Sequence, residues 1–257
     1  MNVQIYLAVT PEEYQNAARH CRSFAHVAYR IGTDSTLLRQ SLLLQTRGGL
    51  LTVSDRDTPK IEHPEKLCAA VLRECSRRSY GGVLLDFEES VSHDRLAFAE
   101  QLGHLLSNSR RSLYVPEQYA RSVSSAIALI CTAISGGNFT ERLKEAAGLR
   151  GSAGRLALDV QRLRMDFRLP AKTGRGSPLS AGELQALIER EQPAVFFSQD
   201  LCARYFTYIH NGDAHFVLFD DADTLNQKLQ IGASLGFAAA FFMWPEIKDI
   251  ADQLKLR

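Results

Sequence analysis

The segment GGVLLDFEES, residues 81–90, decides the fold that we predict for this chain. Its β-rich composition indicates a strand, in which successive side chains point to opposite faces. One face would carry only apolar side chains, those of Val83, Leu85 and Phe87. The other face would carry Leu84 and then two carboxylates, Asp86 and Glu88. The segment therefore predicts a buried strand with two acids at its C-terminal end.

Asp86 and Glu88 occupy the position at which α/β barrels build their active sites. In such barrels the C-terminal ends of the parallel strands form the catalytic rim. Two close carboxylates perturb each other, because ionisation of one disfavours ionisation of the second and can hold one group protonated near neutral pH. The pair would then supply a general acid. Another interpretation stays open, in which these acids cap the following helix or pair with an arginine.

Short β-rich runs alternate with helical patterns along almost the whole chain of 257 residues. This alternation is typical of repeated βα units around a parallel sheet. The predicted strands are Val3 to Leu7, Phe24 to Ile31, Leu50 to Val53, Val83 to Phe87, Leu113 to Val115, Ala126 to Ile134, Leu156 to Val160 and Ala238 to Trp244. They favour a closed (β/α)8 TIM barrel of the α/β class, although the pattern alone also permits an open doubly wound sheet.

The alternation is broken before the last predicted strand. The helix-like stretch LSAGELQALIERE is followed by two β-rich runs, Tyr205 to Ile209 and His215 to Phe219. Asn211 and Gly212 join these runs, and both residue types accept the positive φ angles of a tight hairpin turn. We therefore predict a small antiparallel hairpin insertion at about residues 179–221, within a single TIM-barrel domain of residues 1–257.

Charge and cysteine content limit the classes of partner and cofactor. With 30 basic and 29 acidic residues, the chain has no net field to attract nucleic acid or an anionic membrane, and neither partner is expected. The five cysteines contain no C-x-x-C pair and predict neither zinc nor a disulfide framework. The histidines have no spacing typical of a metal site, and the chain has no Gly-rich phosphate loop, so no metal or other cofactor is expected. The first residues lack the basic region of a signal peptide, which favours a cytoplasmic location. The oligomeric state is left open.

The segment Gly81 to Glu88 resembles the fourth strand of glycoside hydrolase family 18, which carries the pattern D-x-x-D-x-D-x-E. Asp86 and Glu88 match the last two acids of that pattern, whereas Gly81 and Leu84 replace the first two. The block FVLFDDADTLNQKLQIGASLGFAAAFFMW is similar to the family's last helix and last strand. The resemblance covers about residues 80–250 and implies a divergent barrel of the chitinase or spore-cortex N-acetylglucosaminidase kind.

The resemblance also implies roles for individual residues. Glu88 would protonate the glycosidic oxygen, and Asp86 would orient the substrate's own N-acetyl group, whose carbonyl oxygen is the nucleophile. Trp244, the only tryptophan, would form the aromatic floor of the central sugar subsite, although a core aromatic at a strand end is the alternative. The sixth strand departs from the family, because Cys131 to Ser135 replaces Met-x-Tyr-Asp and the tyrosine that helps to hold the N-acetyl group is missing.

Four further residues are candidate sugar contacts. Asp159 and Gln161 alternate with Val160 on the seventh predicted strand and would face the lumen, where they would bind sugar hydroxyls or serve as satisfied structural groups. Tyr119, after the fifth strand, and Tyr205, in the insertion, are predicted contacts at the rim.

Three functions follow as hypotheses. The leading one is a hydrolase of β-linked N-acetylhexosamine glycans, such as peptidoglycan or chitin fragments, that acts by a substrate-assisted retaining mechanism. The second is a catalytically degenerate, lectin-like barrel that binds glycan without cleaving it, which the missing tyrosine and replaced acids favour. The third is a structural or partner-binding barrel with no affinity for saccharides. The family resemblance adds spore association as a second possible location.

Overall fold

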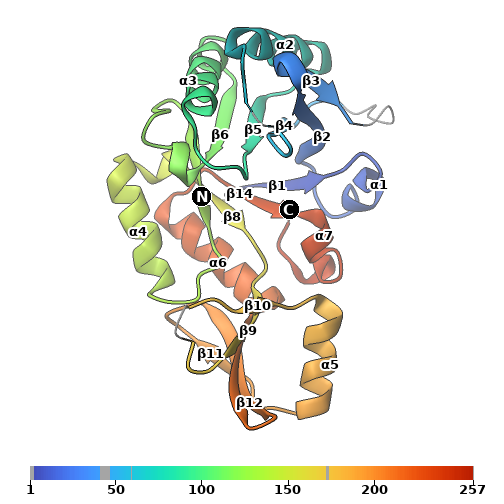
Figure 1. Ribbon diagram of the computed structural model, residues 1–257, viewed down its shortest axis with the longest axis vertical. Helices are drawn as coiled ribbons and strands as arrows, with labels where there is room; N and C mark the ends of the chain where they lie inside the picture. The colour runs from blue at the N-terminus through green and yellow to red at the C-terminus, as the bar shows by residue number, and fades with distance from the viewer. Residues whose placement is uncertain (1–2, 41–46, 59, 172–173, 257) are drawn as a thin grey trace.

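The protein is described by a computed structural model that covers residues 3–40, 47–58, 60–171 and 174–256, and its upper part in Figure 1 is a barrel of parallel strands. Each strand pairs with the next, and β14 pairs with β1 from Gln4↔Ala239 to Ala8↔Met243, which closes the barrel. In order the strands are β1 (Gln4–Val9), β2 (Phe24–Gly32), β4 (Leu50–Ser54), β5 (Gly82–Asp86), β6 (Ser112–Pro116), β7 (Ile127–Cys131), β8 (Leu156–Val160) and β14 (Ala239–Met243). The predicted TIM barrel is confirmed, and a doubly wound sheet is excluded.

Side chains of the barrel strands alternate between the lumen and the helix layer, as the sequence predicts. The lumen is filled by Ala8, Ala25, Leu50, Leu84, Tyr114, Ala157, Ala239 and Phe241. Val83, Leu85 and Phe87 pack instead against the helices that flank β5, which are α2 (Pro64–Arg78) and α3 (His93–Asn108). Asp86 is the last residue of β5 and follows Leu84 on the lumen side. The strand therefore presents its carboxylate at the rim of a filled barrel.

Two further long helices, α4 (Phe139–Arg150) and α6 (Ala222–Leu235), cover the outside of the barrel. The helices α1 (Tyr14–Ala17), α7 (Trp244–Ile247) and η2 (Glu117–Tyr119) are each only about one turn long. The Asn138 side chain caps α4 by accepting the backbone N–H of Glu141 at 3.1 Å. Gly236 ends α6 in the left-handed region, with φ of 85°. No helix in the described ranges is long and apolar enough to cross a membrane.

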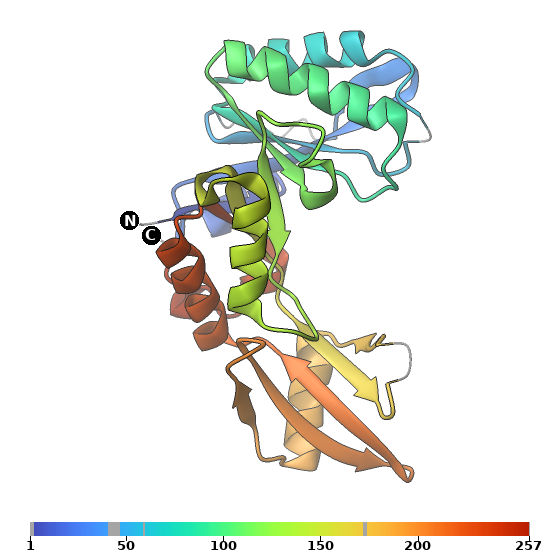
Figure 2. The same ribbon diagram turned by 90° about the vertical axis from the view of Figure 1, so that its left-hand side faces the viewer.

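A second, antiparallel sheet lies below the barrel, as Figure 2 shows, with α5 (Ala181–Glu191) behind it. Its strands, in spatial order, are β10 (Ser177–Pro178), β9 (Arg164–Arg168), β13 (Asp213–Phe219), β12 (Ala203–His210) and β11 (Phe196–Ser198). Asn211 and Gly212, with φ of 52° and 83°, make the hairpin turn between β12 and β13. The predicted hairpin is thus the centre of a larger sheet.

The sheet begins at Arg164, earlier in the chain than the predicted start of the insertion. The five residues RMDFR do alternate between polar and apolar side chains, but so short a run is a weak signal, and the partner of this strand, β13, comes much later in the sequence. The start and the end of the sheet meet again at one point, where the backbone N–H of Asp220 donates to the carbonyl of Leu163 at 2.7 Å. The buried Asp220 carboxylate also accepts from the backbone N–H of Leu163 at 3.0 Å and from Lys228 Nζ at 2.8 Å. This junction fixes the sheet to β8 and α6.

Candidate active site

A cavity of about 290 Å³ opens at the C-terminal ends of the barrel strands. Residues from β5, β7, β8 and β14 and from the turn after β6 line it. Four of the lining side chains are acidic: Asp86, Glu88, Glu117 and Asp159. The cavity therefore brings Asp86 and Glu88 together with Asp159 and Gln161, as the alternation of side chains predicts, and it does so at the end of the barrel where active sites are built.

Asp86 is half-buried at the end of β5, where it lies beside Ser54 of β4. Burial of the Asp86 carboxyl, followed in importance by the negative charges of Glu88, Asp159 and Asp55, raises its pKa to about 6. The sequence predicts that the two acids perturb each other, and Asp86 is the one of the pair whose pKa is raised toward neutral pH. Asp86 can therefore exchange between a hydrogen-bond donor and an acceptor close to pH 6.

Glu88 lies two residues beyond Asp86, after the last residue of β5, and its side chain is exposed at the cavity. Its backbone N–H has left the strand ladder and donates to the Asp55 carboxylate at 2.9 Å. An exposed carboxyl at the mouth can reach a bound ligand without first losing all of its hydration. The two acids of β5 thus occupy different environments, one enclosed and one open.

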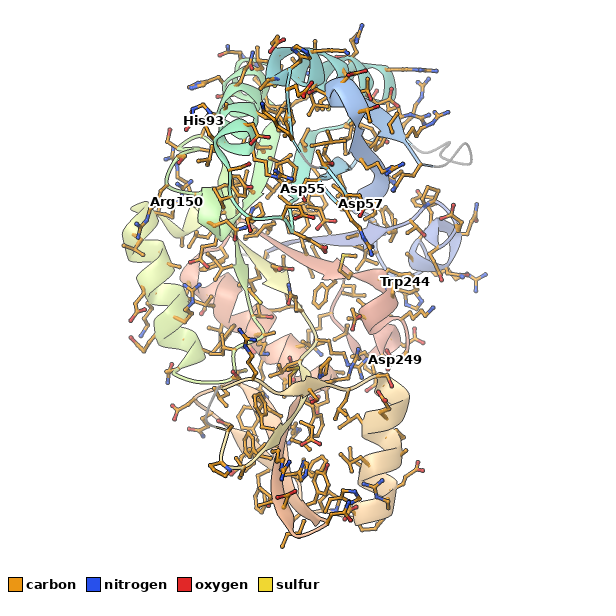
Figure 3. All side chains as sticks on the ribbon, in the orientation of Figure 1. Asp55, Asp57, His93, Arg150, Trp244 and Asp249 are labelled. Atoms are coloured by element: carbon orange, nitrogen blue, oxygen red, sulfur yellow. The ribbon has the colours of Figure 1, made fainter. Side chains whose placement is uncertain are left out.

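Asp55 is a site residue that the sequence analysis does not identify. It directly follows β4 (labelled in Figure 3) and is fully buried. It forms an ion pair with Arg95 of α3, with Oδ2 2.8 Å from Nε. The expected alternative for a strand-end acid, pairing with an arginine, therefore holds for Asp55 and not for Asp86. The available signal was the same one that identified Asp86, an acid at the C-terminal end of a predicted barrel strand.

Asp159 and Gln161 lie on β8 and directly after it, and both line the cavity. Gln161 Nε2 donates to Asp159 Oδ2 at 2.8 Å. Burial raises the pKa of the Asp159 carboxyl, and the hydrogen bond from Gln161 partly offsets that effect. The amide oxygen of Gln161 remains as an acceptor. Contact of these two residues with sugar hydroxyls stays a prediction.

Cys131 lines the cavity at the end of β7, beside Asp159 in the register of β7 and β8. This is the strand that lacks the tyrosine expected from the family resemblance. Burial raises the pKa of the Cys131 thiol, so that the protonated form is favoured. The structure supplies a small neutral group here and leaves the position without a phenol.

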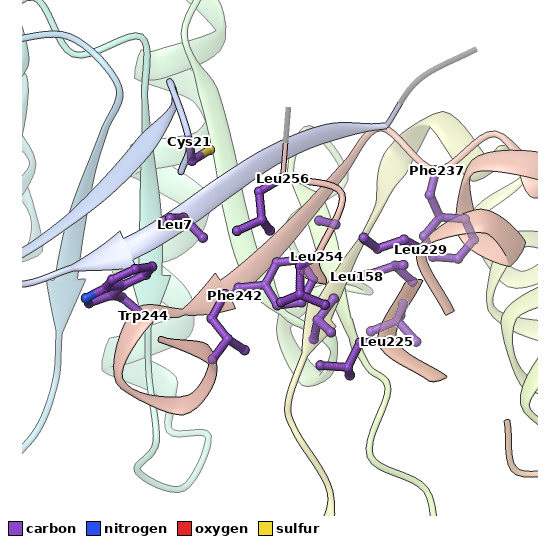
Figure 4. Packing of buried hydrophobic residues seen from close by; sticks show 14 of the residues in the cluster. Leu7, Cys21, Leu158, Leu225, Leu229, Phe237, Phe242, Trp244, Leu254 and Leu256 are labelled. Carbon is purple, nitrogen blue, oxygen red and sulfur yellow. The ribbon is translucent and has the colours of Figure 1, made fainter. Parts of the chain in front are cut away.

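Trp244 does not line the cavity, contrary to the role that the resemblance implies. Its side chain is 3% exposed and packs in the outer layer with Leu7 and Phe242 (Figure 4). Its ring N–H donates to Glu13 Oε2 at 3.2 Å. Along β14 the lumen side is taken by Ala239 and Phe241, so the next residue on that side is Met243, which is 41% exposed and lines the cavity.

The two predicted tyrosine contacts are also placed elsewhere. Tyr119 is 0% exposed and packs against Phe87 on the outside of the barrel, at a centroid distance of 5.7 Å. The two residues before it, Glu117 and Gln118, line the cavity instead. Tyr205 is half-buried on the sheet of the insertion between Phe196 and Phe216. Neither tyrosine is therefore among the ligand contacts that the structure supports.

A second cavity of about 290 Å³ lies at the opposite end of the barrel, at the N-terminal ends of the strands. The sequence analysis assigns no role to it. Its lining includes Arg22, Arg47 and the buried His26. Burial lowers the pKa of His26 to about 4, against a smaller opposing effect of a hydrogen bond with the backbone of Gly48. This end of the barrel is therefore basic at its surface and uncharged inside.

Within the described part of the chain, no three His, Cys, Asp or Glu side chains are grouped so that they could hold a metal ion. The acids of the C-terminal cavity are spread over β5, β8 and the turn after β6. Their arrangement suits proton transfer and hydrogen bonding to an uncharged polar ligand.

Comparison with known proteins gives matches at the level of structure. No family model matches the chain, and no curated protein matches its sequence. A chitinase from Chromobacterium violaceum matches with a TM-score of 0.73 and 15% identity, over 99% of this chain and 98% of that one. The spore cortex-lytic enzyme SleL of Bacillus cereus matches with a TM-score of 0.67 and 15% identity, over 98% of this chain and 74% of that one.

A chitinase from Cycas revoluta, described as a GH18 enzyme in complex with (GlcNAc)4, matches with a TM-score of 0.67 and 10% identity, over 97% of this chain and 96% of that one. The chain has the fold of the family 18 glycoside hydrolases. The family 18 fold predicted from residues 81–90 and from the last helix and strand is thereby confirmed over nearly the full chain. The low identities fit a divergent sequence on that fold.

Proposed function

We propose that this protein is a family 18-like glycoside hydrolase that cleaves β-linked N-acetylhexosamine glycans, namely chitin or peptidoglycan fragments. The observation that carries the proposal is the placement of Asp86 and Glu88, both from β5, in one cavity at the C-terminal mouth of the barrel. The chitinases and the cortex-lytic enzyme that share the fold support this class of substrate. The match to SleL also favours peptidoglycan and a spore-associated location.

In the proposed mechanism, Glu88 donates its proton to the glycosidic oxygen as the bond from that oxygen to the anomeric carbon breaks. The carbonyl oxygen of the substrate's own N-acetyl group forms a bond to the anomeric carbon from the other face. Water then attacks the anomeric carbon and gives a proton to the Glu88 carboxylate as the bond from that carbon to the acetamido oxygen breaks, which restores the N-acetyl group. The configuration is thus retained, and Glu88 is protonated again.

Asp86 serves in this mechanism as the partner of the N-acetyl group. Its ionised carboxylate accepts a hydrogen bond from the acetamido N–H and orients the carbonyl oxygen toward the anomeric carbon. Since burial and neighbouring acids raise the Asp86 pKa to about 6, the group is poised to take up or release a proton during the cycle. Asp159 and Gln161 are proposed to bind sugar hydroxyls beside it.

The test is hydrolysis of chromogenic N-acetylglucosamine oligomers and of purified peptidoglycan by the wild-type protein and by Glu88→Gln. We expect loss of the general acid to lower kcat by about 10²–10⁴-fold. Glu89→Gln is the matched control, because Glu89 is the adjacent exposed glutamate and does not line the cavity. Full activity of Glu88→Gln would remove Glu88 from the mechanism.

A second candidate function is glycan binding without cleavage. Two observations favour it: Trp244 is turned out of the cavity, and β7 presents Cys131 where the family resemblance calls for a tyrosine. This alternative predicts that the wild-type protein and Glu88→Gln bind N-acetylglucosamine oligomers equally well and that neither releases product. Calorimetric titration beside the hydrolysis assay separates the two functions.

We also propose that the chain forms one domain, with the antiparallel sheet as an insertion in the barrel. The hydrogen bonds that join Leu163 to Asp220, and the buried pair of Asp220 with Lys228 of α6, support this division. A single cooperative unfolding transition observed both by far-UV and by near-UV circular dichroism is the expected result.

A further inference from the structure

The backbone of Glu88 is held by a side chain from the neighbouring barrel strand. Glu88 has left the β5 ladder, and its N–H donates to Oδ1 of Asp55 at 2.9 Å. The N–H of Glu89 points to the same oxygen at 3.5 Å. The side chain that carries the exposed carboxyl of Glu88 therefore starts from a backbone position that Asp55 fixes.

Arg95 holds the other oxygen of Asp55 in place. Its Nε donates to Asp55 Oδ2 at 2.8 Å, and the two side chains are 6% and 0% exposed. Its Nη2 donates to the carbonyl of Thr58 at 2.6 Å, and its Nη1 to Ser92 Oγ at 3.2 Å. The network thus connects the loop after β4, the loop after β5 and the first turn of α3 around one carboxylate.

Stability alone does not account for such a pair. Taking two charges out of water is costly, and well-packed apolar residues of similar volume often replace a buried ion pair without loss of stability. Apolar residues could not accept a hydrogen bond from the backbone N–H of Glu88. The charged oxygen of Asp55 accepts it, and such a bond is stronger than one to a neutral acceptor. The specific contribution of Asp55 is therefore its hold on the segment that carries Glu88.

We infer that Asp55, held by Arg95, is a positioning residue for Glu88. This inference rests on the proposed function, in which Glu88 is the general acid, and adds a residue to it. Proton transfer to a glycosidic oxygen requires the carboxyl to lie within hydrogen-bond reach, and a misplacement of about 1 Å can cost about 10²-fold in rate. Loss of Asp55 is thus expected to lower kcat more than it raises KM.

The insertion junction provides a matched control. Asp220 and Lys228 form a second buried pair, 2.8 Å apart and 0% and 1% exposed, and Asp220 also accepts a backbone N–H, that of Leu163. This pair has the same kind of geometry as Asp55 with Arg95, but it accepts the backbone N–H of Leu163 and not that of Glu88. Removing it should affect stability in the same way and leave proton transfer intact.

The experiment compares two double variants, Asp55→Leu/Arg95→Met and Asp220→Leu/Lys228→Met, with the wild-type protein and Glu88→Gln. Each double variant removes both charges, so that neither is left buried and unpaired. We expect both double variants to fold and to melt cooperatively, by circular dichroism. On chromogenic N-acetylglucosamine oligomers, Asp55→Leu/Arg95→Met should lose about 10–100-fold in kcat with KM changed by less than about threefold. Asp220→Leu/Lys228→Met should keep its kcat within about threefold.

Wild-type kcat in a folded Asp55→Leu/Arg95→Met protein would overturn the positioning role while leaving Glu88 as the acid. Equal losses of kcat in the two double variants would overturn it as well, because the effect would then follow from any buried pair. Absence of turnover by the wild-type protein would instead overturn the proposed function, and the inference with it. If Asp55→Leu/Arg95→Met fails to fold, Asp55→Asn against Asp220→Asn gives the same comparison, with the same expected difference in kcat.

Discussion

The barrel has a cavity of about 290 Å³ at each end, and the two cavities differ in their chemistry. At the C-terminal mouth, Asp86, Glu88 and Asp159 converge from the ends of two strands. At the N-terminal mouth, a buried His26 lies beneath the exposed Arg22 and Arg47. Cavity volume therefore does not distinguish an active site from a gap beneath the barrel.

Each mouth shifts the pKa of one residue toward its uncharged form, and the two shifts share their largest cause but differ in the smaller ones. Burial is the largest cause of the raised Asp86 pKa and of the lowered His26 pKa. At Asp86 three further carboxylates act in the same direction. At His26 the hydrogen bond with Gly48 opposes the effect of burial, and the smaller effect of the Arg78 charge acts with burial. Convergence of like charges marks the site that is built to move a proton.

The largest expected difference between the mouths is in turnover. Asp86→Asn removes the carboxylate that orients the N-acetyl group, and kcat/KM on N-acetylglucosamine oligomers should fall by about 10²–10³-fold. His26→Gln, at the other mouth, should leave kcat/KM within about twofold and lower the free energy of unfolding by about 1–3 kcal/mol. Steady-state kinetics and urea unfolding of both variants check the contrast. A large loss of turnover in His26→Gln would show that the N-terminal mouth takes part in the reaction.

The two mouths should also give opposite pH dependences of stability. Between the unfolded pKa of 3.8 and about 6, the folded protein holds the proton of Asp86 more tightly, so this group makes stability fall by roughly 3 kcal/mol as pH rises. Between about 4 and the unfolded pKa of 6.5, the unfolded chain holds the proton of His26 more tightly. His26 therefore makes stability rise by roughly 3 kcal/mol over nearly the same range.

In the wild-type protein these two contributions should largely cancel from pH 4 to pH 6. Asp86→Asn should leave the His26 contribution alone and give stability that increases with pH, while His26→Gln should give stability that decreases. Asp86→Asn should also be more stable than the wild-type protein at pH 7. Urea unfolding at pH 4, 5, 6 and 7 measures these slopes, and parallel curves for the three proteins would contradict the assignment.

A smaller effect distinguishes the side chains that belong to the C-terminal cavity. Met243→Ala removes an exposed lining side chain and should raise KM about three- to tenfold with little change in Tm. Trp244→Phe removes the hydrogen bond to Glu13 from the outer layer, and should lower the free energy of unfolding by about 1–2 kcal/mol with KM unchanged. A raised KM in Trp244→Phe with no change in Met243→Ala would indicate that Trp244 contacts the sugar after all.

The smallest effect is expected at the surface of the N-terminal mouth. Arg22 is exposed there, so Arg22→Gln should change the free energy of unfolding by less than about 0.5 kcal/mol and leave turnover unchanged. Thermal melts with and without added phosphate provide the measurement. If phosphate stabilised the wild-type protein but not Arg22→Gln, the N-terminal mouth would contain an anion-binding site. The proposed contrast, in which only the C-terminal cavity is functional, would then be wrong.

The barrel could be predicted from the sequence because its signals are local. Each strand is a short β-rich run, and the alternation of side chains within residues 83–88 places Leu84 in the lumen and Asp86 at the rim. The same alternation applied to β14 places Met243 inside and Trp244 outside. The family resemblance implies a place for Trp244 in the sugar subsite, whereas in the structure Trp244 packs in the outer layer.

The parts that were missed depend on contacts between distant segments. Strand β9 alternates over only five residues, and its partner β13 lies much later in the chain. Asp55 acquires its role from Arg95 on α3 and from the backbone of Glu88. Tyr119 lies in the short turn η2, where no strand period fixes the direction of a side chain. Local patterns therefore give the elements and the two acids, whereas the supporting residues require the fold.

The junction of Leu163 with Asp220 has a consequence for how this barrel can change. The two ends of the inserted segment are hydrogen-bonded to each other, so the junction closes the loop at its base. The entropic cost of closing a loop grows only slowly with the number of residues in it. We expect residues 164–219 to behave as a replaceable cassette. A short turn or a differently shaped module grafted between β8 and α6 should leave the barrel folded, which makes this position a natural point for evolution or engineering to vary the protein.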